Sequence, residues 1–170
     1  MLVGTAILAP ATVQDCRVQA LFAQDGQTSD AFGLALCFDG HMAVIAAPGR
    51  SGAYVFELER ESWSAASLLV PRDGYESVFG FGASTAVSGE TVLVGASGNG
   101  YPPYLGSVSV FQRHASGTTW TEVERLRADH GSEYDGFGSS LSASGGWLLV
   151  GAPYRLDLPF QEGTVYLYRR

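Results

Sequence analysis

One stretch of sequence occurs three times in this chain, and this repetition constrains the fold more than any other feature. The copies are FGLALCFDGHMAVIAAP from Phe32, FGASTAVSGETVLVGAS from Phe81 and FGSSLSASGGWLLVGAP from Phe137. They align without a gap, and in each the Gly of the FG pair precedes the closing tripeptide by 13 residues. A repeat of this length predicts one supersecondary unit per copy, which buries its faces against its neighbours.

Each copy is typical of two antiparallel strands joined by a tight turn. The predicted turns contain residues that tolerate the positive φ of two-residue hairpins: Asp39-Gly40, Ser88-Gly89 and Gly145-Gly146. The run after each turn is almost entirely apolar, which predicts a strand buried on both faces at 42–47, 91–96 and 147–152. Small residues end this run and would let a neighbouring sheet approach closely.

Two further strand patterns follow the first two copies in a fixed order, and the first of these patterns also follows the third copy. Val108 and Val110 alternate with polar neighbours at the period of two expected of a strand. A segment that begins at Trp63 or Trp120 then leads into a turn that contains Asp and Gly. The unit therefore has four strands, named a to d in chain order, with strand a beginning at the FG pair. Four-stranded antiparallel units that are buried on both faces are the blades of a β-propeller.

We therefore predict an all-β chain that forms a single domain over residues 1–170, with repeats at about 32–74, 81–131 and 137–170. Residues 1–23 are predicted to add strands: 16–23 match strand d, and 4–9 match strand c without a clear place in the repeat. Residues 1–11 are also apolar and short, as in a signal peptide. The first basic residue is Arg17, however, so we favour a strand.

The strand count leaves the last blade incomplete, because residues 137–168 supply strands a, b and c alone. Residues 16–23 are the candidate for its strand d. Three blades fall short of the usual four to eight. Two arrangements remain open: a homo-oligomer in which two copies pair head to tail as a six-bladed ring, which we favour, or a piece of a longer propeller.

Charge and composition argue against several partners. The net charge is −7, whereas nucleic-acid binding needs a basic surface, so no nucleic-acid partner is expected. No stretch approaches the ~20 apolar residues of a membrane helix, so the chain is not expected to span a membrane. Cys16 and Cys37 fall in different kinds of strand, and two free thiols are expected. Nothing in the sequence calls for a cofactor.

The pattern FG…GAP, followed by G-x-V-Y-x-F, a Trp strand and an Asp-Gly turn, resembles the FG-GAP repeat over essentially the whole chain. This resemblance implies blades like those in the seven-bladed propeller of integrin α subunits and in bacterial surface proteins, and an extracellular or cell-surface location. Many integrin-type repeats bind calcium in a long D-x-D-x-D-G loop between strands a and b. The a–b turns here are minimal and offer Asp39, Glu90 or no acid, so that calcium site cannot be carried over.

In a propeller the d–a and b–c loops emerge on one rim, and this rim gathers the candidate binding residues. The d–a loops contain acids: Asp25, Asp30, Asp73, Glu76, Asp129, Glu133 and Asp135. The b–c loops contain the predicted ligand-binding residues: Arg50, Asn99, Tyr101, Tyr104, Tyr154, Arg155, Asp157 and Phe160. Such a mixture indicates a recognition surface, although Asp-Gly loops also simply form turns. Asp129, Glu133 and Asp135 are weak metal candidates, because they supply oxygen ligands without a recognised spacing.

Catalytic patterns are missing from the sequence. Ser139 and Ser140 lie in no G-x-S-x-G elbow, and the three histidines have no metal-ligand spacing. The resemblance instead implies a non-enzymatic scaffold whose rim engages a protein or glycan partner. The alternatives are a propeller enzyme that acts on glycans, which would need two carboxylates at about 5–9 Å, and a purely structural module that assembles with itself.

Overall fold

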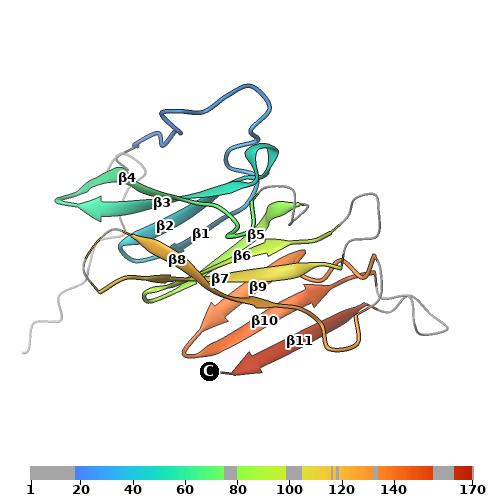
Figure 1. Cartoon of the computed structure of the whole chain (residues 1–170). Helices are drawn as coiled ribbons and strands as arrows, with labels where there is room; N and C mark the ends of the chain where they lie inside the picture. Colours follow the sequence, from blue (N-terminus) through green and yellow to red (C-terminus); the bar gives the residue numbers. More distant parts are fainter. Residues whose placement is uncertain are drawn as a thin grey trace, which may run out of the picture.

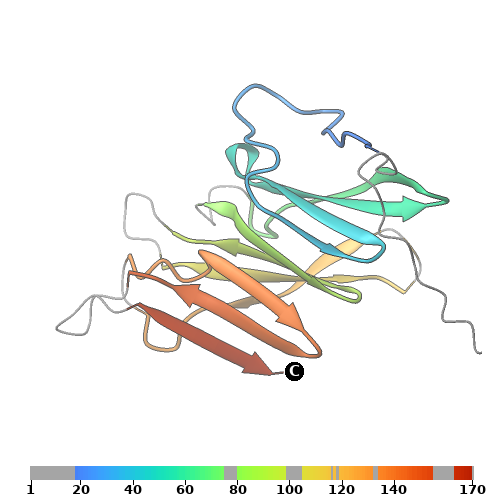
Figure 2. The same cartoon turned by 180° about the vertical axis from the view of Figure 1, so that it is seen from behind.

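The protein consists of three stacked antiparallel β-sheets in a computed structural model, which describes residues 18–74, 80–98, 105–115, 117, 119–131, 134–154 and 163–169. Sheet 1 and sheet 3 lie at opposite ends of the stack, with sheet 2 between them (Figure 1 and Figure 2). A single short helix, η2 (Pro48–Arg50), occurs within the described ranges. None of the helical structure in those ranges is long and apolar enough to cross a membrane. The predicted all-β fold of propeller-type blades is confirmed.

Strands follow one another in chain order within each sheet. Sheet 1 contains β1 (Leu36–Asp39), β2 (Met42–Ala47), β3 (Gly52–Glu59) and β4 (Ser62–Leu69). Sheet 2 contains β5 (Phe81–Ser88), β6 (Thr91–Ala96), β7 (Ser107–Arg113) and β8 (Trp120–Leu126). In the described residues, sheet 3 contains β9 (Ser140–Ser144), β10 (Trp147–Ala152) and β11 (Thr164–Arg169). The sheets therefore supply the predicted strands a to d twice, followed by a, b and c.

Tight a–b turns are present in all three sheets. Two residues separate the paired strands in each: Gly40-His41, Gly89-Glu90 and Gly145-Gly146. The first glycine of each turn has a φ of 56°, which side chains other than glycine adopt at a cost. The predicted hairpins are confirmed, with the first two turns displaced by one residue.

The three sheets share one pairing register, so their positions correspond. The last residue of strand b pairs with the first residue of strand c each time: Ala47 with Gly52, Ala96 with Ser107 and Ala152 with Thr164. In the middle sheet, one face of strand b packs on the preceding sheet and the other on the following sheet. Val94, for example, contributes to the core between sheets 1 and 2, and its neighbour Leu93 to the core between sheets 2 and 3.

Small residues at the end of strand b bring the sheets close together, as predicted. A Cβ atom at Gly95 would overlap the carbonyl oxygen of Gly138, which precedes β9 of the next sheet. The Ser84 hydroxyl donates a 2.7 Å hydrogen bond to the same carbonyl oxygen. Backbone contact between sheets 2 and 3 at this point therefore requires a glycine.

The predicted start of strand a is wrong in two of the three sheets. Strand β5 begins at Phe81, but β1 and β9 begin several residues after Phe32 and Phe137. The glycine of the FG pair has a positive φ in all three sheets: 92° at Gly33, 96° at Gly82 and 89° at Gly138. In β5, Phe81 still pairs with Ala96, but the pairing is irregular between Phe81 and Ser84. Such a backbone leaves the extended conformation, so regular strand pairing begins only after it.

The strand predicted at 16–23 is absent from the single chain over its described part, because residues 18–23 form no strand there. They lie along sheet 1, where Leu21 and Ala23 pack beside Tyr54 and Phe56. Sheet 3, which has three strands, lies at the far end of the stack (Figure 1 and Figure 2). A strand needs an open edge beside it, and sheet 3 is out of reach of this segment. The predicted strand at 4–9 lies outside the described residues.

Candidate functional site

The rim predicted to bind a partner is built on three copies of one turn. Strands b and d of sheets 1 and 2 run in the same direction, so the loops that follow them emerge on the same side. The d–a loop begins each time with an amide of glycine that donates to a carbonyl three residues earlier: Gly26 to Ala23, Gly74 to Pro71 and Gly131 to Ala128. These turns carry the aspartates Asp25, Asp73 and Asp129 on the rim.

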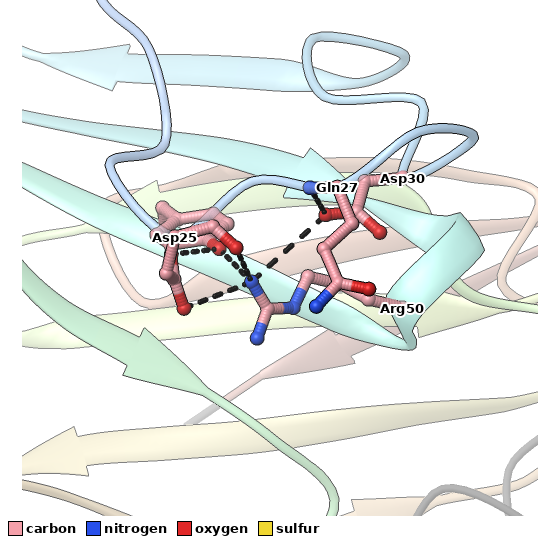
Figure 3. Close-up of polar contacts among 5 residues, drawn as sticks. Asp25, Gln27, Asp30 and Arg50 are labelled. Atoms are coloured by element: carbon pink, nitrogen blue, oxygen red, sulfur yellow. Dashed lines mark hydrogen bonds and ion pairs between the residues drawn. The ribbon is translucent and has the colours of Figure 1, made fainter.

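The rim of sheet 1 holds a polar cluster made by three elements. Arg50 comes from η2, Asp25 from the d–a turn and Tyr54 from β3. Arg50 Nη1 lies 2.9 Å from Asp25 Oδ2, and the Tyr54 hydroxyl donates a 2.7 Å hydrogen bond to Asp25 Oδ1. Arg50 also contacts the Tyr54 hydroxyl. Figure 3 shows the guanidinium between Asp25 and Asp30, whose carboxylate is 3.9 Å away.

Mutual contacts shift the ionisation of this cluster. The hydrogen bond from Tyr54 holds the pKa of Asp25 below its ordinary value. Burial, together with the hydrogen bond to Asp25, raises the pKa of Tyr54 to about 12. Asp25 and Arg50 therefore remain an ion pair at neutral pH, with 58% of the Asp25 side chain and 24% of the Arg50 side chain exposed.

Two of the predicted rim acids, Asp30 and Asp135, build the loops themselves. The carbonyl of Asp30 accepts a 3.0 Å hydrogen bond from the amide of Gly49, and the carbonyl of Asp135 accepts the equivalent bond from Tyr154. The Asp30 carboxylate also accepts a 2.7 Å bond from the amide of Gln27 (Figure 3). Asp135 is only 2% exposed. The backbone carbonyls of these two residues therefore fix the d–a loop to the b–c loop.

The other predicted site residues are only partly placed. Tyr154 is 55% exposed on the rim of sheet 3. No group of three His, Cys, Asp or Glu side chains that could hold a metal ion occurs among the described residues. Several predicted positions lie outside those residues: Glu76, Asn99, Tyr101, Tyr104, Glu133, Arg155, Asp157 and Phe160.

Sequence reasoning missed a second ionic cluster, which joins sheets 1 and 2. Arg125 Nε and Nη2 donate to the two carboxylate oxygens of Glu122 at 2.8 and 3.0 Å, and Nη1 lies 3.0 Å from Asp73. Residues three apart in a regular strand point to opposite faces. Here a bulge in β8, opposite the Val110–Phe111 step of β7, brings Glu122 and Arg125 to one side. The sequence alone does not predict this ion pair, because an acid and an arginine three residues apart would lie on opposite faces of a strand without a bulge.

Acids of the a–b turns join the sheets on the opposite rim. Asp39 accepts a 2.9 Å hydrogen bond from the amide of Gly89 in the next sheet. Arg113 Nη2 lies 2.5 Å from Glu57 of sheet 1, and its Nε lies 2.6 Å from Glu90. The acids that the sequence offers in these turns therefore already have protein partners.

Two four-stranded antiparallel sheets and a three-stranded one, stacked with equivalent loops on one rim, define a protein built from β-propeller-type blades. Residues 120–168 match the model of the FG-GAP repeat family, in agreement with the resemblance of the sequence pattern. The match begins with β8 and includes β9, β10 and β11, so the sequence unit combines strand d of one sheet with strands a to c of the next. A comparison with curated proteins gave no match.

Tyr54 is expected to make the stability of the protein fall at high pH. Because its folded pKa is about 12 and its ordinary value is 10.0, the folded protein keeps a proton that the unfolded chain releases. This stabilisation is complete below about pH 10 and is lost as the pH rises to about 12. Between about pH 9 and about pH 11, the free energy of unfolding, measured with urea, should decrease less for Tyr54→Phe than for wild type. Tyr154→Phe, on the exposed rim, is the control. If the free energy of unfolding decreased equally in wild type and Tyr54→Phe, Tyr54 would not be the cause of the pH dependence.

Proposed function

We propose that this protein is a non-enzymatic interaction module that binds a protein or glycan partner through the rim formed by its d–a and b–c loops. The observation that carries the proposal is the cluster of Asp25, Arg50 and Tyr54, in which charged groups are fixed in place while parts of them face solvent. Tyr154 adds an exposed aromatic side chain to the same rim. Fixed charges and aromatic rings bind with little loss of conformational entropy.

A cavity between sheets 2 and 3 favours binding over glycan hydrolysis. It has a volume of 590 Å³ and is lined by Ser88 at the end of β5 and by the a–b turn residue Gly146, so it opens on the opposite rim. Its described lining contains one carboxylate, Glu124. Glycoside hydrolysis typically uses two carboxylates about 5–9 Å apart.

The proposal includes completion of the blades to a closed ring, either by a second copy of the chain or by further blades of a longer propeller. The outer faces of sheets 1 and 3 carry exposed apolar side chains, among them Leu36, Phe38 and Leu167. Further sheets would cover these faces. A cell-surface or extracellular location, implied by the resemblance to integrin-type repeats, is part of the same proposal.

Binding of the fluorescently labelled protein to arrays of immobilised glycans and peptides tests the function. Tyr154→Ala and Arg50→Gln should each weaken binding by roughly 10-fold, as expected for residues at the centre of an interface. His41→Ala, an exposed position on the opposite rim, is the matched control and should bind as wild type. Equal binding by all variants, or no binding by wild type, would contradict the proposal. Release of reducing sugar from bound glycans would favour the enzyme instead.

A further inference from the structure

We propose that sheet 3 binds sheet 1 of a second copy of this chain, and that residues 18–23 of that copy add a fourth strand to β11. Two copies joined head to tail at both ends would form a ring of six sheets, within the usual range for propellers. This inference rests on the proposed ring and specifies its partner and its contacts.

The outer face of sheet 3 has the composition of a buried interface. Three apolar positions of sheet 1 are completely buried against sheet 2, namely Val44, Ala53 and Val55. The register assigns the equivalent positions of sheet 3 to Leu149, Val165 and Leu167. These side chains are 43%, 65% and 59% exposed. A face with this apolar surface is expected to be covered by another sheet.

Sheet 1 exposes the complementary face. Val87 of β5 is 7% exposed in the core between sheets 1 and 2, on the face that each sheet turns to the preceding one. Phe38 occupies the equivalent position of β1, where it is 62% exposed, and Leu36 on the same face is 68% exposed. Sheet 3 therefore exposes the face that packs on a following sheet, and sheet 1 exposes the face that packs on a preceding sheet. A head-to-tail contact requires these two different surfaces.

The two end sheets also carry the two sides of the polar contact that joins sheets 2 and 3: sheet 3 has one side and sheet 1 has the other. Between sheets 2 and 3, Ser84 and Gly95 receive the carbonyl of Gly138. Ser140 and Gly151 are their equivalents in sheet 3, and a Cβ atom at Gly151 would overlap the Ser140 hydroxyl as one at Gly95 would overlap the Ser84 hydroxyl. The serine is therefore turned the same way in both sheets.

Gly33 is the matching half on sheet 1. Its φ of 92° is close to the 89° of Gly138, and its amide makes the same hydrogen bond to strand b. A Cβ atom at Gly138 would lie 2.6 Å from the Ser107 carbonyl oxygen of sheet 2, whereas at Gly33 it would meet nothing within 4 Å. Docking on a second copy would place Gly33 against Gly151 and Ser140.

Residues 18–23 already lie where strand d of a preceding sheet would be. Leu69 and Leu126 each lie two residues before the carbonyl that closes the Asp-Gly turn, and each packs against the sheet that follows it. Leu21 has the same position relative to Ala23 and packs against sheet 1. What these residues lack is a neighbouring strand c, and β11 of a second copy would supply one.

The register of that pairing follows from the two complete sheets. Val55 pairs with Ser67 in sheet 1, and Val110 pairs with Glu124 in sheet 2. The equivalent pair would be Leu167 of one copy and Gln19 of the other. The new strand would also cover the 590 Å³ cavity between sheets 2 and 3, which is lined by residues that include Leu126 and Tyr168.

Light scattering on a sizing column tests the association. Wild type should have twice the mass of one chain, which is 18.0 kDa. Leu149→Asp and Leu167→Asp should elute as single chains, because each places a charge on the docking face. Leu105→Asp is the matched control, since Leu105 is 51% exposed but lies on neither end face. A wild type that stays monomeric as its concentration rises, or a dimer that both variants retain, overturns the proposal.

A cysteine pair tests the exchange of residues 18–23. Gln19→Cys and Leu167→Cys are combined in a background without native cysteines (Cys16→Ser, Cys37→Ala). Paired antiparallel residues have Cα atoms about 4.5–5.5 Å apart, within the range of a disulfide. Within one chain the two positions lie at opposite ends of the stack (Figure 1 and Figure 2). Mild oxidation should therefore give covalent dimers, and the pair Gln19→Cys with Leu105→Cys should not.

A dimer without this cross-link would overturn the exchange of residues 18–23. Circular dichroism of each variant excludes loss of the fold as the cause of a monomeric mass, since every substituted position on the docking face is exposed. Both measurements use the protein without a ligand. Failure of the rim to bind a partner would leave them unchanged, so the two proposals fail separately.

Discussion

Replacing Phe137 with alanine is expected to lower the free energy of unfolding by about 3–5 kcal/mol. The side chain is 2% exposed and lies in the core between sheets 2 and 3. Its ring centroid is 5.2 Å from that of Tyr166 and 6.4 Å from that of Tyr168, both in edge-on contact. The loss combines apolar burial, the cavity that remains and two aromatic contacts.

Urea unfolding followed by circular dichroism measures this loss. Phe137→Leu keeps most of the volume and should lose less than half as much. The comparison is made in the Leu167→Asp background, so that self-association does not add to the apparent stability. A decrease of less than about 1 kcal/mol for Phe137→Ala would show that sheet 3 adds little to the stability of the stack.

Replacing Arg125 with methionine is expected to cost a similar amount, about 3–5 kcal/mol, because it leaves a buried carboxylate without its cation. The Glu122 side chain is 2% exposed, and Arg125 contacts both of its oxygens. The backbone amide of Arg72 donates a further 2.7 Å bond to Glu122, so the pair joins strand d of sheet 2 to the loop after strand d of sheet 1.

The double variant Arg125→Met with Glu122→Gln is the control for this pair. It removes the buried charge together with its partner, so it should be more stable than Arg125→Met alone. Arg125→Lys keeps the charge without the two-pronged contact and should be intermediate. If Arg125→Met costs less than about 1 kcal/mol, the pair contributes no more than an exposed salt bridge would.

Local sequence patterns determined most of the fold. Hairpin turns are encoded by glycines such as Gly40 and Gly145, whose positive φ is a property of single residues. The apolar run of β2 and the alternation of β7 record which faces are buried. The repeat, which occurs three times with the same internal spacing, then indicated the order of the strands in each sheet. It also indicated correctly that the described part of 137–168 supplies three strands.

Parts of the candidate site could also be predicted, because rim loops follow from strand order. The sequence predicts Arg50 and Tyr154 in the loops that follow strand b, and the structure places both residues directly after that strand. The sequence did not indicate that Arg50 is held by Asp25 and Tyr54. Those three residues belong to different elements, and their contact depends on how the d–a loop folds over β3.

Tertiary structure alone decided the features that depend on register and on neighbouring sheets. The bulge in β8 brings Glu122 and Arg125 to one side, and no periodic pattern reveals an inserted residue. Residues 18–23 have the sequence of strand d yet form no strand, because their partner must come from another sheet. A strand is stabilised by hydrogen bonds to a neighbouring strand. The sequence can therefore specify where a strand is able to form, but the strand forms only where that neighbour is present.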